Sequence, residues 1–215
     1  MTRMRYGVPN ALVADTLHGT RKEKITNNIE ERCREIRYAF FANILKDNSR
    51  FAAVLVAHHQ DDLLETYLLQ KQRNILPNYY GLKEENIIYG IKIIRPLLGY
   101  KKCELEAFCK ENHIPYALDY TNFLDVFSRN KIRHHVIEKM TEEDRRKLLL
   151  EIENKNKELQ LAILEANELD NLSNQEVLKL SPTIYRLYLK KLAKEVLLDF
   201  EVSKKVSDQI RKVLE

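Results

Sequence analysis

The sequence predicts an α/β fold in which helices cover a parallel β-sheet, followed by an all-helical region. The apolar run 51–57 and the β-branched run 87–94 are both typical of buried strands. A segment with helical spacing of apolar residues follows each run, and this alternation indicates a parallel sheet. From Thr141 onward the sequence carries helical patterns and no strand signal. We therefore expect an α/β domain over residues 1–140 and a helical region over residues 141–215.

The elements of the first part are predicted from apolar periodicity and from turn residues. A helix over 30–45 has a set of residues at helical spacing, namely Cys33, Ile36, Arg37, Phe40, Phe41 and Ile44. The strand 51–57 and a helix over about 61–73 follow it. Pro77 and Gly81 mark residues 74–86 as a loop, and Gly90 allows the strand 87–94 to bend.

Three further elements complete the expected α/β domain. A helix over 101–112 is expected to turn Leu105, Phe108 and Cys109 inward. A short strand over 115–118 and a loop over 119–128 follow, and residues 129–140 are expected to form another helix.

The last part of the chain is expected to be helical. Thr141 followed by three acidic residues is a typical helix start. A charged helical pattern then extends to about Asp170, with an apolar stripe made of Leu148, Ile152, Leu159 and Ile163. Shorter helices are expected near 182–198 and 202–214.

Composition indicates a cytoplasmic protein that is not a membrane protein. No apolar run approaches the roughly 18 residues that a membrane span needs, and we see no signal peptide at the N-terminus. Three cysteines form no metal-binding spacing, so we expect them reduced and in the core. The net charge of +4 is uneven. Residues 1–140 carry 22 Lys and Arg against 17 Asp and Glu, which weakly favours a polyanionic partner, although a solvated surface would also explain it.

Polar residues follow the first predicted strand and open the next helix. His58, His59, Asp61, Asp62 and Glu65 lie at the carboxyl end of this strand, where open α/β sheets place their ligands. The amides of a helix N-terminus stabilise carboxylates, so this cluster suits a Mg²⁺ ion on Asp62 or the ammonium group of a substrate. Asp62-x-x-Glu65 also resembles a capping box, which needs no function.

Two other clusters are candidates for anion binding. Arg95, followed by Pro96, ends the second predicted strand, and its guanidinium suits phosphate or carboxylate; a surface ion pair is the alternative. Arg129 and Arg133 share a helix face with Asn130 nearby, which suggests an anionic neighbour or else a solvated basic face. Three further histidines, His113, His134 and His135, are interpreted as solvated or packed.

These clusters, in this order, resemble the tRNA(Ile)-lysidine synthases of the PP-loop ATPase family. The resemblance covers roughly residues 30–140. It rests on Glu31-x-x-Arg34-x-x-Arg37-Tyr38, His58-His59-x-Asp61-Asp62-x-x-Glu65-Thr66, Arg95-Pro96-Leu97-Leu98, Asp119-x-x-Asn122 and Arg129-Asn130-x-Ile132-Arg133. It implies a Rossmann-like sheet and an appended helical region.

The resemblance also implies a reaction. Free L-lysine is attached, with ATP and Mg²⁺, to the wobble cytidine of an isoleucine tRNA: the cytosine C2 oxygen is adenylylated, the lysine ε-amine attacks C2, and AMP leaves. Asp61, Asp62 and Glu65 would bind lysine and metal, with His58, His59 and Arg95 beside them. Arg129 and Arg133 would face phosphate on the nucleotide or, with Asn130, on the tRNA.

One part of the family pattern is not found in the chain. The family grips ATP with a Ser-Gly-Gly-x-Asp-Ser loop, but the chain has no Gly-Gly pair and residues 1–28 do not resemble that loop. We therefore expect an N-terminally incomplete sheet in a fragment, a decayed copy, or a split gene product completed by a separate chain. Alone, it is expected neither to adenylylate tRNA nor to bind ATP tightly. The alternatives are a non-catalytic tRNA-binding remnant and a metal-dependent phosphohydrolase using the His-His-x-Asp-Asp motif.

Overall fold

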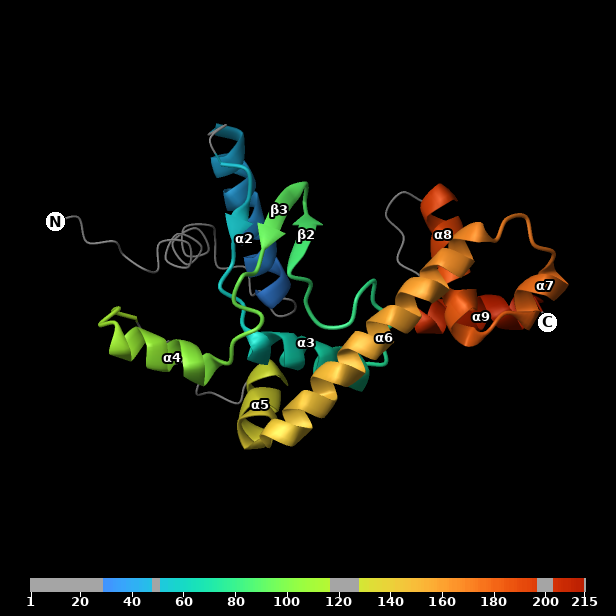
Figure 1. Ribbon diagram of the computed structural model, residues 1–215. Helices are drawn as coiled ribbons and strands as arrows, with labels where there is room; N and C mark the ends of the chain where they lie inside the picture. Colours follow the sequence, from blue (N-terminus) through green and yellow to red (C-terminus); the bar gives the residue numbers. More distant parts are fainter. Residues whose placement is uncertain (1–28, 48–50, 117–127, 197–202, 215) are drawn as a thin grey trace. The chain divides into compact units, whose positions relative to one another are not determined.

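The computed structural model describes residues 29–47, 51–116, 128–196 and 203–214 (Figure 1). The described elements are, in order, α2 (Ile29–Asp47), β1 (Val54–Leu55), α3 (Gln60–Gln72), β2 (Glu85–Ile88), β3 (Ile91–Ile94), α4 (Lys102–Glu111), α5 (Ser128–His135), the 3-10 helix η2 (Ile137–Lys139), α6 (Glu142–Glu168), α7 (Asn174–Lys179), α8 (Pro182–Val196) and α9 (Lys204–Leu214).

The chain divides into two compact units, each described below by itself. The sheet unit comprises Met1–Leu63 and Lys83–Val126, and the helical unit comprises Leu64–Leu82 and Phe127–Glu215. Helix α3 begins in the first and continues into the second. The boundary that we expected near residue 140 stays a prediction.

The sheet unit contains a mixed three-stranded sheet in the order β1-β3-β2. β1 runs parallel to β3, with Val54 beside Ile93 and Leu55 beside Ile94. The expected α/β fold and the parallel pairing of the two apolar runs are therefore confirmed. Only two residues of the run 51–57 form ladder pairs, so the first strand is shorter than expected.

The segment 87–94 is not the single strand that the sequence predicted. β2 and β3 form an antiparallel hairpin, in which Ile88 pairs with Ile91 across the turn residues Tyr89 and Gly90. Both turn residues have positive φ, 50° and 76°, as the two central residues of a type I′ hairpin turn require. Glycine adopts this conformation without strain, and tyrosine rarely does. This rarity explains why a bend, rather than a turn, was expected at Gly90.

Helix α2 covers one face of the sheet (Figure 1). Its bounds agree with the predicted helix, but the buried contact is made by Tyr38, which is 5% exposed and which the expected face had left out. Tyr38 packs with Ile91 and Ile93, and Phe41, Ala42 and Leu45 extend this cluster. Ile44 is instead 36% exposed, so the inward face is rotated from the expected one.

Helix α4 forms where the sequence predicted a helix, but its expected inward face is wrong. No α4 residue is buried, and Phe108 is 57% exposed. The cysteines were also expected in the core, yet Cys103 is exposed and Cys109 is half-buried; the side chain of Cys33 lies outside the described part. Apolar spacing marks the face that could be buried, but it does not supply the partner that buries it. Pro115 and Tyr116 are not in a strand, and the rest of the segment expected to form one lies outside the described residues.

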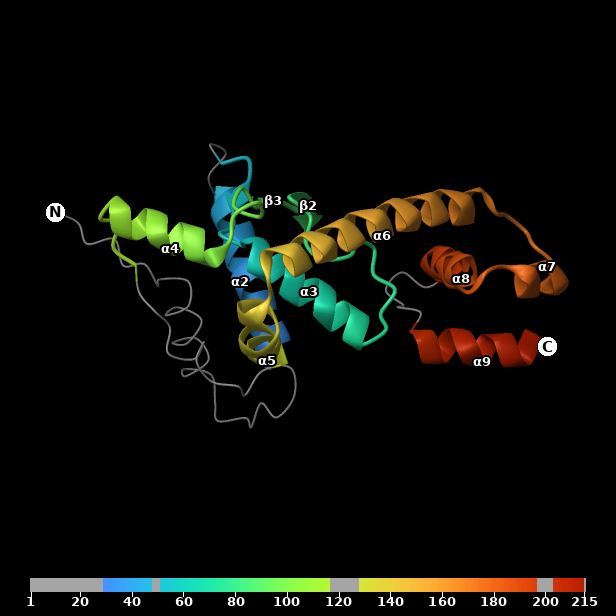
Figure 2. The same cartoon turned by 60° about the horizontal axis from the view of Figure 1, so that its bottom comes forward.

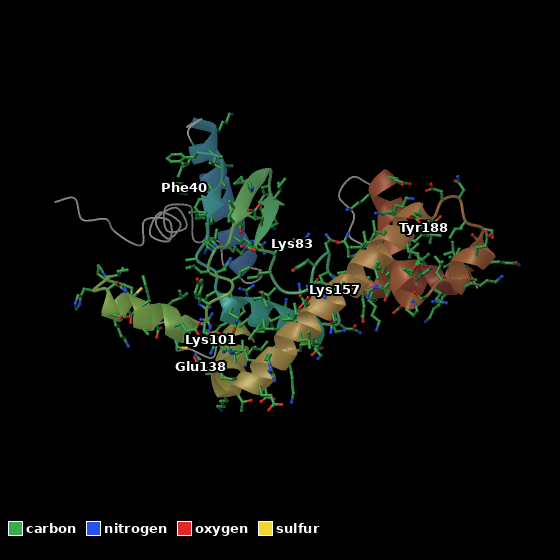
Figure 3. All side chains as sticks on the ribbon, viewed as in Figure 1. Phe40, Lys83, Lys101, Glu138, Lys157 and Tyr188 are labelled. Atoms are coloured by element: carbon green, nitrogen blue, oxygen red, sulfur yellow. The ribbon has the colours of Figure 1, made fainter. Side chains whose placement is uncertain are left out.

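The core of the helical unit forms between α6 and α8, which pack against each other (Figure 2). α6 begins at the expected residue, because the Thr141 side chain accepts a hydrogen bond of 3.1 Å from the Asp144 amide. Ile152 and Leu159 of its predicted stripe are buried. On α8, Tyr188 is 2% exposed and packs with Val177 of α7 (Figure 3). The sequence reading missed α7, whose six residues are too few for a periodic signal.

Two side-chain amides fix the loop that follows α3. The Asn156 amide donates to the Tyr80 carbonyl at 3.0 Å and accepts from the Tyr80 amide at 2.8 Å. On either side of Tyr80, the Gln70 side-chain amide donates to the Tyr79 carbonyl and accepts from the Gly81 amide. The loop is therefore held through its backbone groups. The Tyr80 ring packs against the Tyr67 ring, with the two ring centroids 5.9 Å apart.

The helix expected over 129–140 is interrupted. α5 ends at His135, Val136 has φ −120°, and the short helix η2 follows. None of the described helices is both long enough and apolar enough to cross a membrane.

Candidate functional site

His58 and Arg95 meet at one edge of the sheet. Each follows the end of a strand, β1 or β3, and the parallel pairing continues one step further, because the Val56 amide donates to the Ile94 carbonyl at 2.9 Å. Arg95 Nε then donates to His58 Nδ1 at 3.0 Å. The sequence placed each motif at the end of its own predicted strand, and the parallel pairing of these strands brings the two motifs to one sheet edge.

The Arg95 guanidinium is buried, with only 3% of the residue exposed. Its Nη1 atom donates to the Lys83 carbonyl at 2.8 Å and to Asn86 Oδ1 at 2.7 Å. Burial lowers the pKa of Arg95, and Tyr38 opposes that shift. The guanidinium thus bonds protein acceptors on two sides, and its expected contact with phosphate stays a prediction.

Asp62 caps the helix that it opens. α3 begins at Gln60, so His59 is the N-cap residue, and the Asp62 carboxylate accepts a hydrogen bond of 2.9 Å from the His59 amide. The same carboxylate lies 3.5 Å from His59 Nδ1, and both side chains are 15% exposed. The capping pair is therefore His59 and Asp62, and not the pair Asp62 and Glu65 that the spacing suggested. Capping uses one oxygen of Asp62 and leaves its charge at the helix N-terminus.

The Mg²⁺ ion expected on Asp62 would need further oxygen ligands. Asp61 is 8% exposed in the first turn of α3, next to Asp62. Within the described ranges, no group of three or more His, Cys, Asp or Glu side chains is arranged to hold a metal ion. Mg²⁺ is usually bound by one or two carboxylates together with substrate phosphates. Asp62 therefore suits a Mg²⁺ that arrives with a nucleotide, whereas a two-metal hydrolytic centre would need ligands that the described residues do not gather.

In the helical unit, Glu65 and Arg133 form a buried ion pair. Arg133 Nε donates to the Glu65 carboxylate, and the two side chains are 13% and 1% exposed. Sequence reasoning had given Glu65 to lysine or metal and Arg133 to phosphate. The structure joins the two side chains, so any role of either one must accommodate the other.

The other candidate residues are more scattered. Arg129 is half-buried and Asn130 is 8% exposed, both on α5. His113 and His135 are exposed and His134 is half-buried, as expected of solvated or packed histidines. The motif Asp119-x-x-Asn122 lies outside the described residues.

A second polar network in the helical unit connects α3 to α6. Tyr67 is fully buried, and its hydroxyl donates to the Glu151 carboxylate. Lys71 Nζ lies 2.7 Å from the same carboxylate. Burial and this acceptor raise the pKa of the Tyr67 hydroxyl. For Glu151, burial acts to raise the pKa, but the hydrogen bonds from Lys71 and Tyr67 outweigh it, and the pKa is lowered.

We predict that Tyr67→Phe lowers the free energy of unfolding by about 1.5–3 kcal/mol, the range for a hydrogen bond to a charged group. The phenyl ring keeps the packing on Tyr80, so the loss reports the hydroxyl alone. Urea denaturation measures it. Tyr100→Phe is the matched control, because Tyr100 is 54% exposed and its change should stay within about 0.5 kcal/mol.

The same network predicts a dependence on pH. Because the folded pKa of Glu151 is lowered, its contribution to stability is present above the ordinary carboxyl pKa of about 4.3 and is lost as pH falls through the folded value. The difference between Tyr67→Phe and the unmodified chain should therefore shrink in acid. An equal difference in the free energy of unfolding at neutral pH and in acid would contradict a hydrogen bond from Tyr67 to a charged Glu151.

Sequence reasoning missed Asn86, Tyr67 and Glu151. Asn86 had been placed in a loop, but the hairpin pairs it with Ile93 and so carries it next to Arg95. Only recognition of the two-residue turn at Tyr89-Gly90 would have shown this, and tyrosine is not a typical residue for such a turn. Glu151 is 84 residues from Tyr67, and nothing in either local pattern indicates the pairing.

Comparison with known proteins decides the family. The family model of the PP-loop domain matches residues 10–140. The chain belongs to the PP-loop domain family. The matched span starts upstream of α2, the helix in which the sequence resemblance begins.

Curated relatives of this PP-loop chain are named tRNA(Ile)-lysidine synthase. The protein from Mesoplasma florum is 34% identical over 205 residues, covering 87% of this chain and 51% of its own length. The one from Ureaplasma parvum is 41% identical over 107 residues, covering 50% of this chain and 32% of its own length. The one from Mycoplasma mycoides is 43% identical over 109 residues, covering 51% of this chain and 27% of its own length. The chain thus spans about half the length of these relatives, or less.

Proposed function

We propose that the chain acts in the ATP-dependent attachment of lysine to the wobble cytidine of an isoleucine tRNA, in the cytoplasm. The observation that carries the proposal is the meeting of two separate motifs of the predicted set at one sheet edge, where Arg95 bonds His58. The similarity to relatives named for this enzyme supports it. ATP, Mg²⁺, free lysine and isoleucine tRNA are the proposed substrates and partners, with a separate chain as a further candidate partner.

The acidic start of α3 is the proposed lysine site. Asp61 and Asp62 lie in its first turn, beside His59. A carboxylate at this position can orient an ammonium group, which places the amine for attack. Glu65 already pairs with Arg133, so a lysine ammonium could use Glu65 only by sharing that carboxylate. We therefore assign the principal charge contact to Asp62.

The α5 helix is the proposed RNA-contacting element. Arg129, Asn130 and Arg133 lie on it, and two arginines within a helix of eight residues suit a phosphate backbone. Arg133 is fixed by Glu65, whereas Arg129 is half-buried and forms no ion pair with the residues that the structure describes. Arg129 is thus the clearer residue with which to test RNA contact.

The test measures incorporation of radiolabelled lysine into an isoleucine tRNA transcript with ATP and Mg²⁺. Two versions are compared: the chain as it stands, and the chain with the family's Ser-Gly-Gly-x-Asp-Ser loop fused ahead of α2. A transcript with its wobble cytidine replaced is the control substrate. Incorporation by either version, on the unaltered transcript only, supports the proposal. No incorporation by two folded versions contradicts it.

A binding measurement separates RNA recognition from chemistry. Arg129→Ala should weaken tRNA binding and reduce the slope of log affinity against log salt by about one unit, if Arg129 contacts one phosphate. Lys157→Ala is the matched control, because Lys157 is exposed on α6 and pairs with Glu153 at 2.7 Å (Figure 3). An unchanged slope for Arg129→Ala would remove α5 from the RNA interface. RNA binding without lysine transfer would instead favour a non-catalytic tRNA-binding protein.

A further inference from the structure

The hydrogen bond between Arg95 and His58 determines where His58 carries its proton. An arginine guanidinium has five N–H donors and no acceptor. Because Arg95 Nε donates to His58 Nδ1 at 3.0 Å, Nδ1 must be the acceptor and cannot carry a hydrogen. A neutral imidazole has one N–H, so its proton is then on Nε2. Protonating Nδ1 would place an N–H donor, on a cationic ring, against an N–H donor of a second cation.

The guanidinium is anchored strongly enough to impose this choice. Its Nη1 atom bonds the Lys83 carbonyl and Asn86 Oδ1 at 2.8 and 2.7 Å. The Arg95 backbone is fixed as well, because its amide donates to the Glu84 carbonyl at 2.8 Å. All of these partners belong to the sheet unit. With 3% of the residue exposed, rotating Nε away from His58 would also break the contacts at Nη1.

We propose that Arg95 is a positioning residue that holds His58 as the neutral tautomer with its proton on Nε2. This assignment goes beyond the phosphate contact expected of Arg95 and does not depend on the reaction. It also limits what His58 can do: the ring can donate through Nε2–H, and it is a poor candidate for a base acting through Nδ1. Only the use of that donor toward a substrate rests on the proposed function.

Nuclear magnetic resonance tests the tautomer directly. The full chain is labelled with ¹⁵N-histidine, and long-range ¹H–¹⁵N correlations are recorded at about pH 8, where an unperturbed imidazole is neutral. The His58 signals are assigned by their loss in His58→Gln. We expect a protonated Nε2 and an unprotonated Nδ1 for His58. His113, which is exposed, is the internal control and should show averaged tautomers. A proton on Nδ1 of His58 in the unmodified chain overturns the proposal without any variant.

Two variants separate positioning from mere folding. Arg95→Met removes the donor while keeping an unbranched apolar side chain, and it should shift His58 toward a mixture of tautomers. Lys92→Met is the matched control on β3, since Lys92 has a side chain 50% exposed and is salt-bridged to Glu85 at 2.9 Å. It should leave the His58 signals unchanged. If Arg95→Met is folded and His58 keeps a single Nε2-protonated form, another group sets the tautomer and the proposal fails. If Arg95→Met does not fold, the spectrum of the unmodified chain still decides.

The tautomer and the reaction can fail independently. If neither folded version transfers lysine but His58 is protonated on Nε2, the proposed function is contradicted and the positioning role of Arg95 is retained. If lysine is transferred but His58 is protonated on Nδ1, the proposed function is supported and the positioning role of Arg95 is contradicted.

Discussion

Replacing Arg133 by methionine is expected to lower the free energy of unfolding by about 3–5 kcal/mol, because it leaves the Glu65 carboxylate buried without its cation. Glu65 is 1% exposed, so water cannot replace the lost partner without opening the core of the helical unit. The side chain of methionine keeps much of the apolar length of arginine, which limits the cavity that the change creates. Urea denaturation at neutral pH measures the loss.

Two companion variants show whether the charge causes this loss. Arg129→Met changes the same residue type on the same helix, at a position without an ion pair among the described residues, and should shift stability by about 0.5 kcal/mol or less. Adding Glu65→Gln to Arg133→Met removes the stranded charge and should restore a large part of the stability. Equal stabilities for the single and the double variant would mean that Glu65 is not the cause.

This pair changes how the tRNA contact should be tested. From the sequence, Arg129 and Arg133 were equivalent members of one basic helix face. In the structure, Arg133 holds Glu65, so a double Arg129→Ala and Arg133→Ala variant would mix lost folding with lost RNA contact. A change in salt dependence is interpretable only for a variant that keeps its fold. Arg129 alone meets that condition.

What the sequence predicted well was local or set by a simple rule of topology. Helices α2, α3, α4 and α6 and the capped start at Thr141 follow from periodicity and capping, which are properties of neighbouring residues. The meeting of His58 with Arg95 follows from the rule that parallel strands end at one sheet edge. That rule needed only two strands to be recognised, and it held although β1 is short.

Most of what the sequence did not predict depended on residues far along the chain. The Glu65–Arg133 pair joins residues 68 positions apart, and each residue looked more like a ligand-binding group than like a partner of the other. Phe108 was placed inward because its spacing is helical, but no described element covers it. The β2–β3 hairpin was missed because its turn has Tyr89 at a positive φ, which gives no turn signal. The ion pair and the exposure of Phe108 are thus decided beyond the local pattern, whereas the hairpin is decided by a local backbone conformation that tyrosine does not signal.

Asp62→Asn is expected to raise the KM for lysine by at least about 30-fold, in whichever version of the chain incorporates lysine. The estimate corresponds to the loss of about 2 kcal/mol or more when one partner of a desolvated charge pair is removed. If Asp62 mainly binds the lysine ammonium, the KM for ATP should change less; an equal rise in the KM for ATP would instead indicate that Asp62 binds the Mg²⁺ that accompanies the nucleotide. Steady-state incorporation with lysine varied at saturating ATP, and then ATP varied at saturating lysine, separates the two effects.

The asparagine variant separates the charge of Asp62 from its capping role. Its amide oxygen can still accept the 2.9 Å hydrogen bond from the His59 amide, so α3 should keep its start and stability should change by about 1 kcal/mol or less. Asp62→Ala removes both the charge and the cap, and should lose stability as well as lysine affinity. Asp208→Asn, at an exposed position of α9, is the control for a remote loss of charge. If Asp62→Asn keeps the KM for lysine while Asp62→Ala loses only stability, Asp62 is a helix cap and the ammonium site lies elsewhere.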